Sequence, residues 1–62
     1  MDTDKAIFMK ILIVEDEKPI SDLIRLNLMK AGYSCTCAFD GMEAADILEE
    51  RNFDLIILDV ML

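Results

Sequence analysis

Apolar residues fall into five segments along this chain, with spacings that alternate between those of strands and those of helices. Residues 11–14 and 55–58 are uninterrupted apolar runs, which are typical of strands buried on both faces of a sheet. Residues 33–38 alternate with a period of two, which predicts a strand at a sheet edge. Apolar residues at helical spacing predict one helix over residues 19–31 and a second from about residue 41 to residue 51.

The predicted helices begin and end at residues with known capping behaviour. Pro19 suits a first helical turn, where its missing N–H costs no hydrogen bond, and Gly32 supplies the left-handed residue that commonly closes a helix. Asp40 stands three residues before Glu43, as in a capping arrangement at the start of the second helix. The positions expected to face the sheet are Ile20, Leu23, Ile24, Leu28 and Ala31 in the first helix and Ala44, Ile47 and Leu48 in the second.

The elements follow one another in the order strand, helix, strand, helix, strand, with short connections. This order calls for a parallel sheet with right-handed crossovers, and therefore for the α/β fold class. The 62 residues are enough for one small unit of marginal stability. Residues 1–9 are predicted to be an N-terminal extension, and residues 10–62 the folded domain.

The chain carries 13 acidic and 6 basic residues, which give it a formal net charge of -7. It therefore lacks the basic surface on which nucleic-acid binding depends, and we expect no direct contact with DNA or RNA. No apolar run approaches the ~20 residues of a membrane span. Cys35 and Cys37 have neither the spacing of a redox pair nor that of a zinc site, and the first residues lack the layout of a signal peptide. We expect a cytoplasmic protein with reduced thiols.

Acidic residues follow two of the predicted strands where each strand ends. Glu15 and Asp16 come after residues 11–14, and Asp59 comes after residues 55–58. Polar chemistry in an open parallel sheet collects beyond the carboxyl ends of the strands. If these strands are neighbours, the three carboxylates repel each other unless a cation neutralises them, and oxygen ligands of this kind suit magnesium. One such acid is more simply explained as the end of a strand or the start of a helix, but three at two strand ends favour a metal site.

Four segments resemble the first half of a response-regulator receiver domain. They are ILIVEDEKPI at residues 11–20, the pair Gly32 and Tyr33, the triplet Phe39, Asp40 and Gly41, and DLIILDVML at residues 54–62. The resemblance covers residues 10–62 and is greatest to the branch whose receivers control winged-helix transcription factors. It implies a truncated flavodoxin-like (βα)2β half-domain, with a three-stranded parallel sheet in the order 2-1-3.

The resemblance also implies a role for each acidic residue. Asp59 would accept a phosphoryl group from the phosphohistidine of a sensor histidine kinase, which makes it the nucleophile. Asp16 would bind magnesium directly, Glu15 would bind it through water, and the backbone carbonyl of Met61 would complete the protein's share of the site. The chain would then be a phosphoacceptor in two-component signalling, and not itself an enzyme.

In the family, a proline, a glycine-containing turn, a threonine or serine and a lysine follow at positions that lie beyond Leu62. The lysine offsets the phosphoryl charge and the hydroxyl senses it, so we expect the modification of Asp59 in this chain to be slow. Without the later strands of the family, residues 55–58 would form an apolar edge with unpaired backbone groups. We therefore expect a homodimer, most simply one with two-fold symmetry.

Two other functions are alternatives on the sequence alone. The chain could be an engineered half-domain that self-associates and has no signalling activity. It could also be a phosphohydrolase with an aspartate nucleophile, because Asp16 follows a strand. Residues 16–20 do not match the DxDxT signature of that class, which disfavours this alternative.

Overall fold

The computed structural model describes residues 9–58 of the chain, and within them it has the five predicted elements in the predicted order. The strands are β1 (Lys10–Val14), β2 (Ser34–Ala38) and β3 (Leu55–Leu58), and the helices are α1 (Lys18–Lys30) and α2 (Gly41–Glu50). Each boundary lies within a residue or so of its predicted place. Neither helix of this part of the chain is long and apolar enough to cross a membrane.

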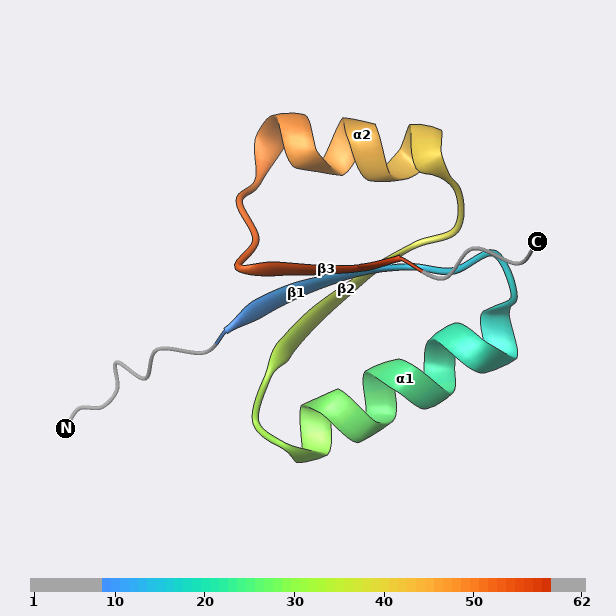
Figure 1. The fold of residues 1–62 in the computed structure, drawn as a ribbon, viewed down its shortest axis with the longest axis vertical. Coiled ribbons are helices and arrows are strands. Elements are labelled where there is room, and N and C mark those ends of the chain that lie inside the picture. The colour runs from blue at the N-terminus through green and yellow to red at the C-terminus, as the bar shows by residue number, and fades with distance from the viewer. Residues whose placement is uncertain (1–8, 59–62) are drawn as a thin grey trace, which may run out of the picture.

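The three strands form one parallel sheet in the order β2-β1-β3, with β1 in the centre (Figure 1). Helix α1 lies on one face of the sheet and α2 on the other, so the sheet is the middle layer. This arrangement confirms the predicted α/β class and the 2-1-3 strand order. The positions of the two helices follow from right-handed crossovers between parallel strands. The chain moves in one direction along the sheet from β1 to β2 and in the other direction from β2 to β3. The two crossover helices therefore lie on opposite faces.

The core is built around β1, whose residues Ile11, Leu12, Ile13 and Val14 are all buried. Leu12 and Val14 pack with Ala38 and with residues of α2, so even-numbered positions of β1 face that helix. Side chains alternate along a strand, so Ile11 and Ile13 face α1. The doubly buried pattern predicted for residues 11–14 is therefore confirmed. A strand covered by a helix on each face can be apolar at every position.

Helix α1 ends, and helix α2 begins, at the capping residues that the sequence predicted. Gly32 has a φ of 98° and closes α1. Its N–H donates to the carbonyl of Met29, and the N–H of Tyr33 donates to the carbonyl of Leu28, which is the double hydrogen bond of a Schellman motif. A residue other than glycine would be strained at this φ.

At the start of α2, Asp40 and Glu43 satisfy two backbone donors between them. The side chain of Asp40 accepts a hydrogen bond from the N–H of Glu43 at 2.7 Å. The side chain of Glu43 reaches back to the N–H of Phe39 at 2.9 Å. In the usual capping box the returning bond goes to the cap residue itself, so this helix uses a variant that reaches one residue further.

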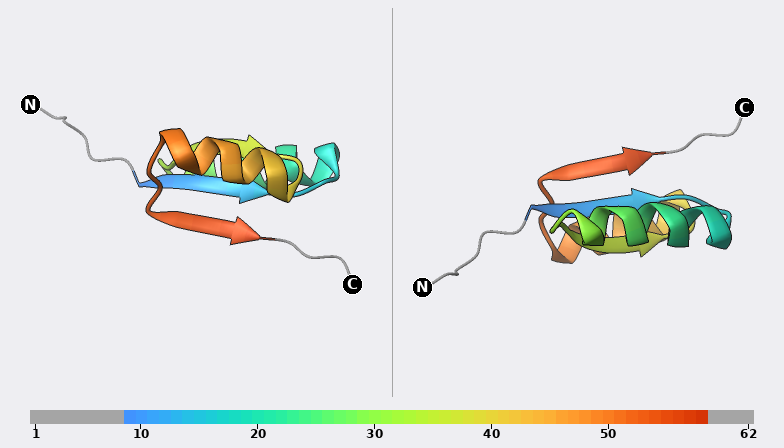
Figure 2. Two further views of the ribbon diagram at one scale, coloured as in Figure 1. Left: turned by 90° about the horizontal axis from the view of Figure 1, so that it is seen from above. Right: turned by 90° about the horizontal axis from the view of Figure 1, so that it is seen from below.

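Strand β3 departs from the expectation of burial on both faces. Its residues Leu55, Ile56 and Leu58 are 47%, 45% and 63% exposed. The two helices lie over β1 and β2, and β3 projects from beneath them (Figure 2). Within residues 9–58 neither helix contacts β3. The apolar run predicts the strand correctly but its burial wrongly, because burial depends on what covers the strand.

Helix α1 also presents a somewhat different face from the one predicted. Ile20, Ile24 and Leu28 are half-buried, as expected, but Leu23 is 60% exposed and Ser21 is fully buried. The side chains of α1 that face the sheet therefore recur every four residues, at Ile20, Ile24 and Leu28, and Ser21 lies beside them. The Ser21 hydroxyl finds no hydrogen-bond partner among residues 9–58.

Replacing Ser21 with alanine is expected to raise the free energy of unfolding by about 1 kcal/mol. A buried polar group without a partner costs ~1–3 kcal/mol, and serine is a weaker helix former than alanine. Urea denaturation followed by circular dichroism measures the change. Ser34→Ala is the matched control, because Ser34 is exposed and its replacement should leave the midpoint nearly unchanged. A lower midpoint for Ser21→Ala would show that the hydroxyl has a stabilising partner.

Candidate functional site

Glu15 follows the last residue of β1 and is 1% exposed. Its N–H donates to the carbonyl of Ala38 at 3.0 Å, which extends the pairing with β2 by one residue. Its carboxylate oxygen Oε2 accepts a hydrogen bond from the N–H of Glu17 at 3.0 Å. Glu15 therefore holds the turn that leads from β1 into α1, a role that its place in the sequence did not reveal.

Asp16 occupies the turn between β1 and α1 and is exposed. Glu17 is the N-cap of α1 and makes no side-chain cap hydrogen bond. The first turn of a helix carries a partial positive charge, which favours carboxylates nearby. Both acids predicted to bind metal after β1 thus lie next to this helix start, one buried and one open to solvent.

Lys18 is the cation nearest in sequence to this turn. Its ammonium group pairs with the carboxylate of Asp22 at 2.9 Å, one helical turn further along α1. Both side chains are largely exposed, so the pair adds little to stability. It does direct the lysine charge along the helix surface toward Asp22.

The other two predicted site residues, Asp59 and Met61, lie outside the described residues. The register of the sheet nevertheless bears on the site, because Val14 of β1 pairs with Leu58 of β3. The residue that precedes Glu15 and the residue that precedes Asp59 are therefore side by side. Residues 9–58 by themselves hold no group of three histidine, cysteine or acidic side chains that could bind a metal.

The acidic residues at this strand end are of the chemical type that binds magnesium. The carboxylates of Glu15 and Asp16 are hard oxygen ligands, and magnesium takes one or two such groups while it keeps several waters. The exposure of Asp16 leaves room for those waters. The chemistry of this strand end therefore fits magnesium and does not fit a softer metal.

At the opposite end of the sheet, Asp54 joins β3 to β1. Its carboxylate Oδ2 accepts from the N–H of Lys10 at 2.8 Å, and its own N–H donates to the carbonyl of Lys10 at 2.7 Å. In the sequence, Asp54 stands directly before the apolar run 55–58, and that position does not indicate these hydrogen bonds. These two hydrogen bonds fix the register of β3 against β1. They therefore also fix the position of Leu58 at the carboxyl end of the strand.

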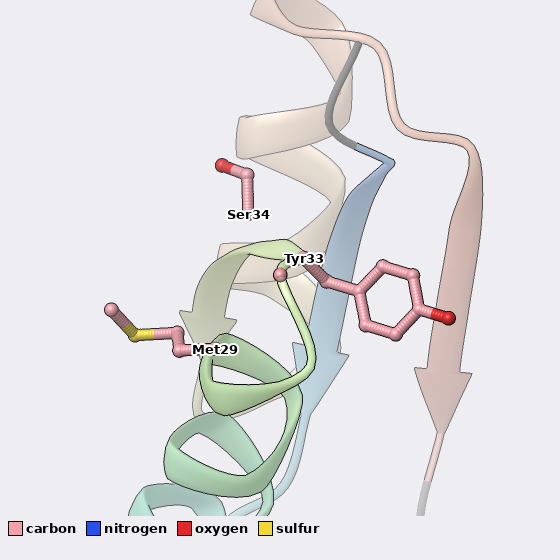
Figure 3. Close-up of a pocket in the computed structure, with 4 residues that line it drawn as sticks. Met29, Tyr33 and Ser34 are labelled. Atoms are coloured by element: carbon pink, nitrogen blue, oxygen red, sulfur yellow. The ribbon is translucent and has the colours of Figure 1, made fainter. Parts of the chain in front are cut away.

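A shallow cavity of about 280 Å³ lies near the same amino end of the sheet (Figure 3). It is lined by Met29, Gly32, Tyr33 and Ser34, at the turn from α1 into β2. In the close-up the Tyr33 ring points toward β3, away from Met29. This turn and the acidic turn of Glu15 lie at opposite ends of α1, so the cavity is separate from the candidate site.

The two cysteines on β2 are free thiols. Cys35 pairs in register with Ile11 and Cys37 with Ile13, so both lie on the α1 face of the sheet. Burial raises the pKa of the Cys35 thiol, and the neighbouring Cys37 raises it further against an opposing effect of Arg25. A raised pKa keeps the thiol protonated, which makes it a poor nucleophile and a poor metal ligand.

The fold and the acidic turn define a doubly wound α/β domain with its polar site beyond the carboxyl ends of the strands. The sequence pattern of the response regulator receiver domain matches residues 11–62, and the chain belongs to this family. The chain is similar to the solved structure of the chemotaxis protein CheY4 of Vibrio cholerae, with a TM-score of 0.85 and 36% identity. That match covers 90% of this chain and 47% of CheY4, so the chain spans about half the length of that protein.

Proposed function

We propose that the chain is a phosphoacceptor module of a two-component response regulator, with Asp59 as the phosphorylated residue. The observation that carries the proposal is the register in which Val14 pairs with Leu58, because it sets the strand end before Asp59 beside the strand end before Glu15. Membership of the receiver family supports it. The acidic turn after β1 then has a clear use, which is to hold a cation next to a carboxylate that receives a phosphoryl group.

In the proposed transfer, a carboxylate oxygen of Asp59 attacks the phosphorus of a phosphohistidine, the P–N bond breaks, and an aspartyl phosphate forms. Magnesium would be held by Asp16, by Glu15 through water, by Asp59 and by the Met61 carbonyl, and it would neutralise charge on the phosphoryl oxygens. Glu15 also fixes the turn through Glu17, so that Asp16 is presented from a defined backbone.

The proposal includes the partner and the setting. A sensor histidine kinase supplies the phosphoryl group, and the chain acts as its substrate and not as an enzyme. We further propose that the protein is cytoplasmic and that residues 10–62 make no direct contact with nucleic acid. We also propose that these residues belong to a longer response regulator, of the branch that controls winged-helix transcription factors. The last point rests on the likeness of residues 10–62 to that branch. Purification of a longer parent protein and a DNA-binding assay would test it.

Magnesium titration tests the acidic site directly. The chain is expected to bind magnesium weakly, because the carboxylates are present while the phosphoryl oxygen that would complete the coordination is not. Isothermal calorimetry should show a saturable heat for the wild type that Asp16→Asn removes. The matched control is Asp46→Asn, which makes the same charge change at an exposed position of α2. Equal heats from wild type and Asp16→Asn would place magnesium elsewhere.

A further inference from the structure

The apolar runs of β1 and β3 do not by themselves determine which residues of the two strands are paired. Residues 11–14 and residues 55–58 are isoleucine, leucine or valine at every position. Where apolar and polar residues alternate, the pattern sets the register, because a shift of one residue turns apolar side chains to the wrong face. A uniform run lacks this contrast, so a shifted β3 would still pair apolar residues with apolar residues. The register is therefore decided at the ends of the strands.

Asp54 is the polar residue at which the pairing of β3 with β1 begins. Because Ile11 pairs with Leu55, Asp54 lies opposite Lys10. The N–H of Asp54 donates to the carbonyl of Lys10 at 2.7 Å, and its carboxylate Oδ2 accepts from the N–H of Lys10 at 2.8 Å. Every register of a parallel ladder offers the same backbone groups, whereas the bond to the carboxylate forms in this register alone. Bonds to a charged acceptor are also the stronger kind.

A shift of β3 by two residues toward the carboxyl end of β1 would break both of these bonds. Asp54 would then lie opposite Leu12, which is 0% exposed and belongs to the core cluster beneath α2. A carboxylate is costly to bring into such apolar surroundings. Asp54 therefore opposes the shift twice, through the hydrogen bonds that it would lose and through the desolvation of its charge.

We propose that Asp54 is a positioning residue for the phosphoacceptor site at the opposite end of the sheet. A parallel strand rises by ~3.3 Å per residue, so a shift of two residues moves the end of β3 by ~6.6 Å relative to the turn at Glu15. Phosphoryl transfer depends on the alignment of the acceptor with the cation site, and a displacement of this size destroys it. The inference rests on the proposed role of Asp59. Its structural part, that Asp54 determines the register, can be tested without that role.

Cysteine pairs across β1 and β3 report the register directly. Cys35 and Cys37 are first replaced by serine, so that no other thiol competes. Val14→Cys combined with Leu58→Cys should form a disulfide on mild oxidation, because these two residues are paired. Val14→Cys combined with Ile56→Cys reports the shifted register. In the observed register this second pair is diagonal, with Cα atoms roughly 8 Å apart, which is beyond disulfide range.

Asp54→Ala is expected to raise the ratio of the shifted to the native crosslink about tenfold, which is the lower range for the loss of an exposed hydrogen bond to a charged group. Asp54→Asn keeps an acceptor oxygen for the N–H of Lys10 and should restore most of the native ratio. Asp46→Ala removes an exposed acid of α2 and should not change it. A residue that only stabilises the fold would lower the urea midpoint without changing the pairing, so an unchanged ratio in Asp54→Ala would overturn the proposal.

Phosphorylation by acetyl phosphate connects the register to the reaction. In the chain with its natural cysteines, Asp54→Ala should slow the gain of a phosphoryl group in proportion to the loss of the native register. Asp54→Asn should restore the rate, and Asp46→Ala should keep the rate of the wild type. An unchanged rate in Asp54→Ala, in spite of a shifted register, would refute the positioning role. A wild type that gains no phosphoryl group would instead overturn the proposed function, while the crosslinks would still show whether Asp54 determines the register.

Discussion

Replacing Leu12 with alanine is expected to remove a large part of the chain's free energy of unfolding. Leu12 is 0% exposed at the centre of the sheet, and it packs in the cluster that joins β1 and β2 to α2. A buried leucine-to-alanine change costs roughly 2 to 5 kcal/mol, from lost burial and from the cavity left behind. A chain of 62 residues has a total stability of roughly 3 to 9 kcal/mol, at ~0.05–0.15 kcal/mol per residue. One substitution can therefore remove most of the stability.

Far-UV circular dichroism with urea denaturation measures this effect. The matched control is Leu23→Ala, since Leu23 is 60% exposed on the outer side of α1. An exposed substitution of this kind changes the free energy of unfolding by within about 0.5 kcal/mol. Similar midpoints for the two variants would mean that the core does not centre on β1.

Substitution of Asp59 by asparagine is expected to abolish phosphorylation by a small phosphodonor altogether. The proposed acceptor is the carboxylate oxygen of Asp59, and an amide in its place is not a nucleophile for this transfer. Incubation of the wild type with acetyl phosphate and magnesium, followed by intact mass analysis, should show a gain of one phosphoryl group.

Two further samples make this result specific. Asp46→Asn removes an exposed acid of α2 that is not part of the turn after β1, and it should leave the modification unchanged. Removal of magnesium by a chelator should suppress the modification in the wild type, because the cation neutralises the charge of the incoming phosphoryl group. A phosphoryl group found on Asp59→Asn would assign the acceptor to another residue.

The order and type of the elements could be predicted because local chemistry decides them. The closure of α1 at Gly32 and the start of α2 at Asp40 depend on residues within a few positions of each helix end. The parallel sheet follows from the alternation of strands and helices. The strand order 2-1-3 follows from the resemblance to the receiver family, because periodicity alone does not determine which strands are neighbours.

Two features do not follow from the pattern of residue types. The exposure of β3 is set by where the helices lie across the sheet, and an apolar run looks the same whether or not a helix covers it. The expectation of an apolar edge at residues 55–58 came from the resemblance to the receiver family and not from the run itself. The hydrogen bond from the N–H of Glu17 to Glu15 depends on the shape of the turn after β1. The sequence could only indicate that Glu15 was one of the acids at that strand end.

The place of β1 in the sheet has a consequence for how the chain is made. β1 precedes β2 and β3 in the sequence and so leaves the ribosome before them, yet it lies between them in the sheet. One neighbour, β3, is joined to it by a hydrogen bond between residues 44 positions apart. Contacts so distant form late, because a long loop must close first. In the nascent chain, β1 thus keeps one open edge until residues 55–58 have emerged, and during that interval it can pair wrongly with a neighbouring chain on the same polysome.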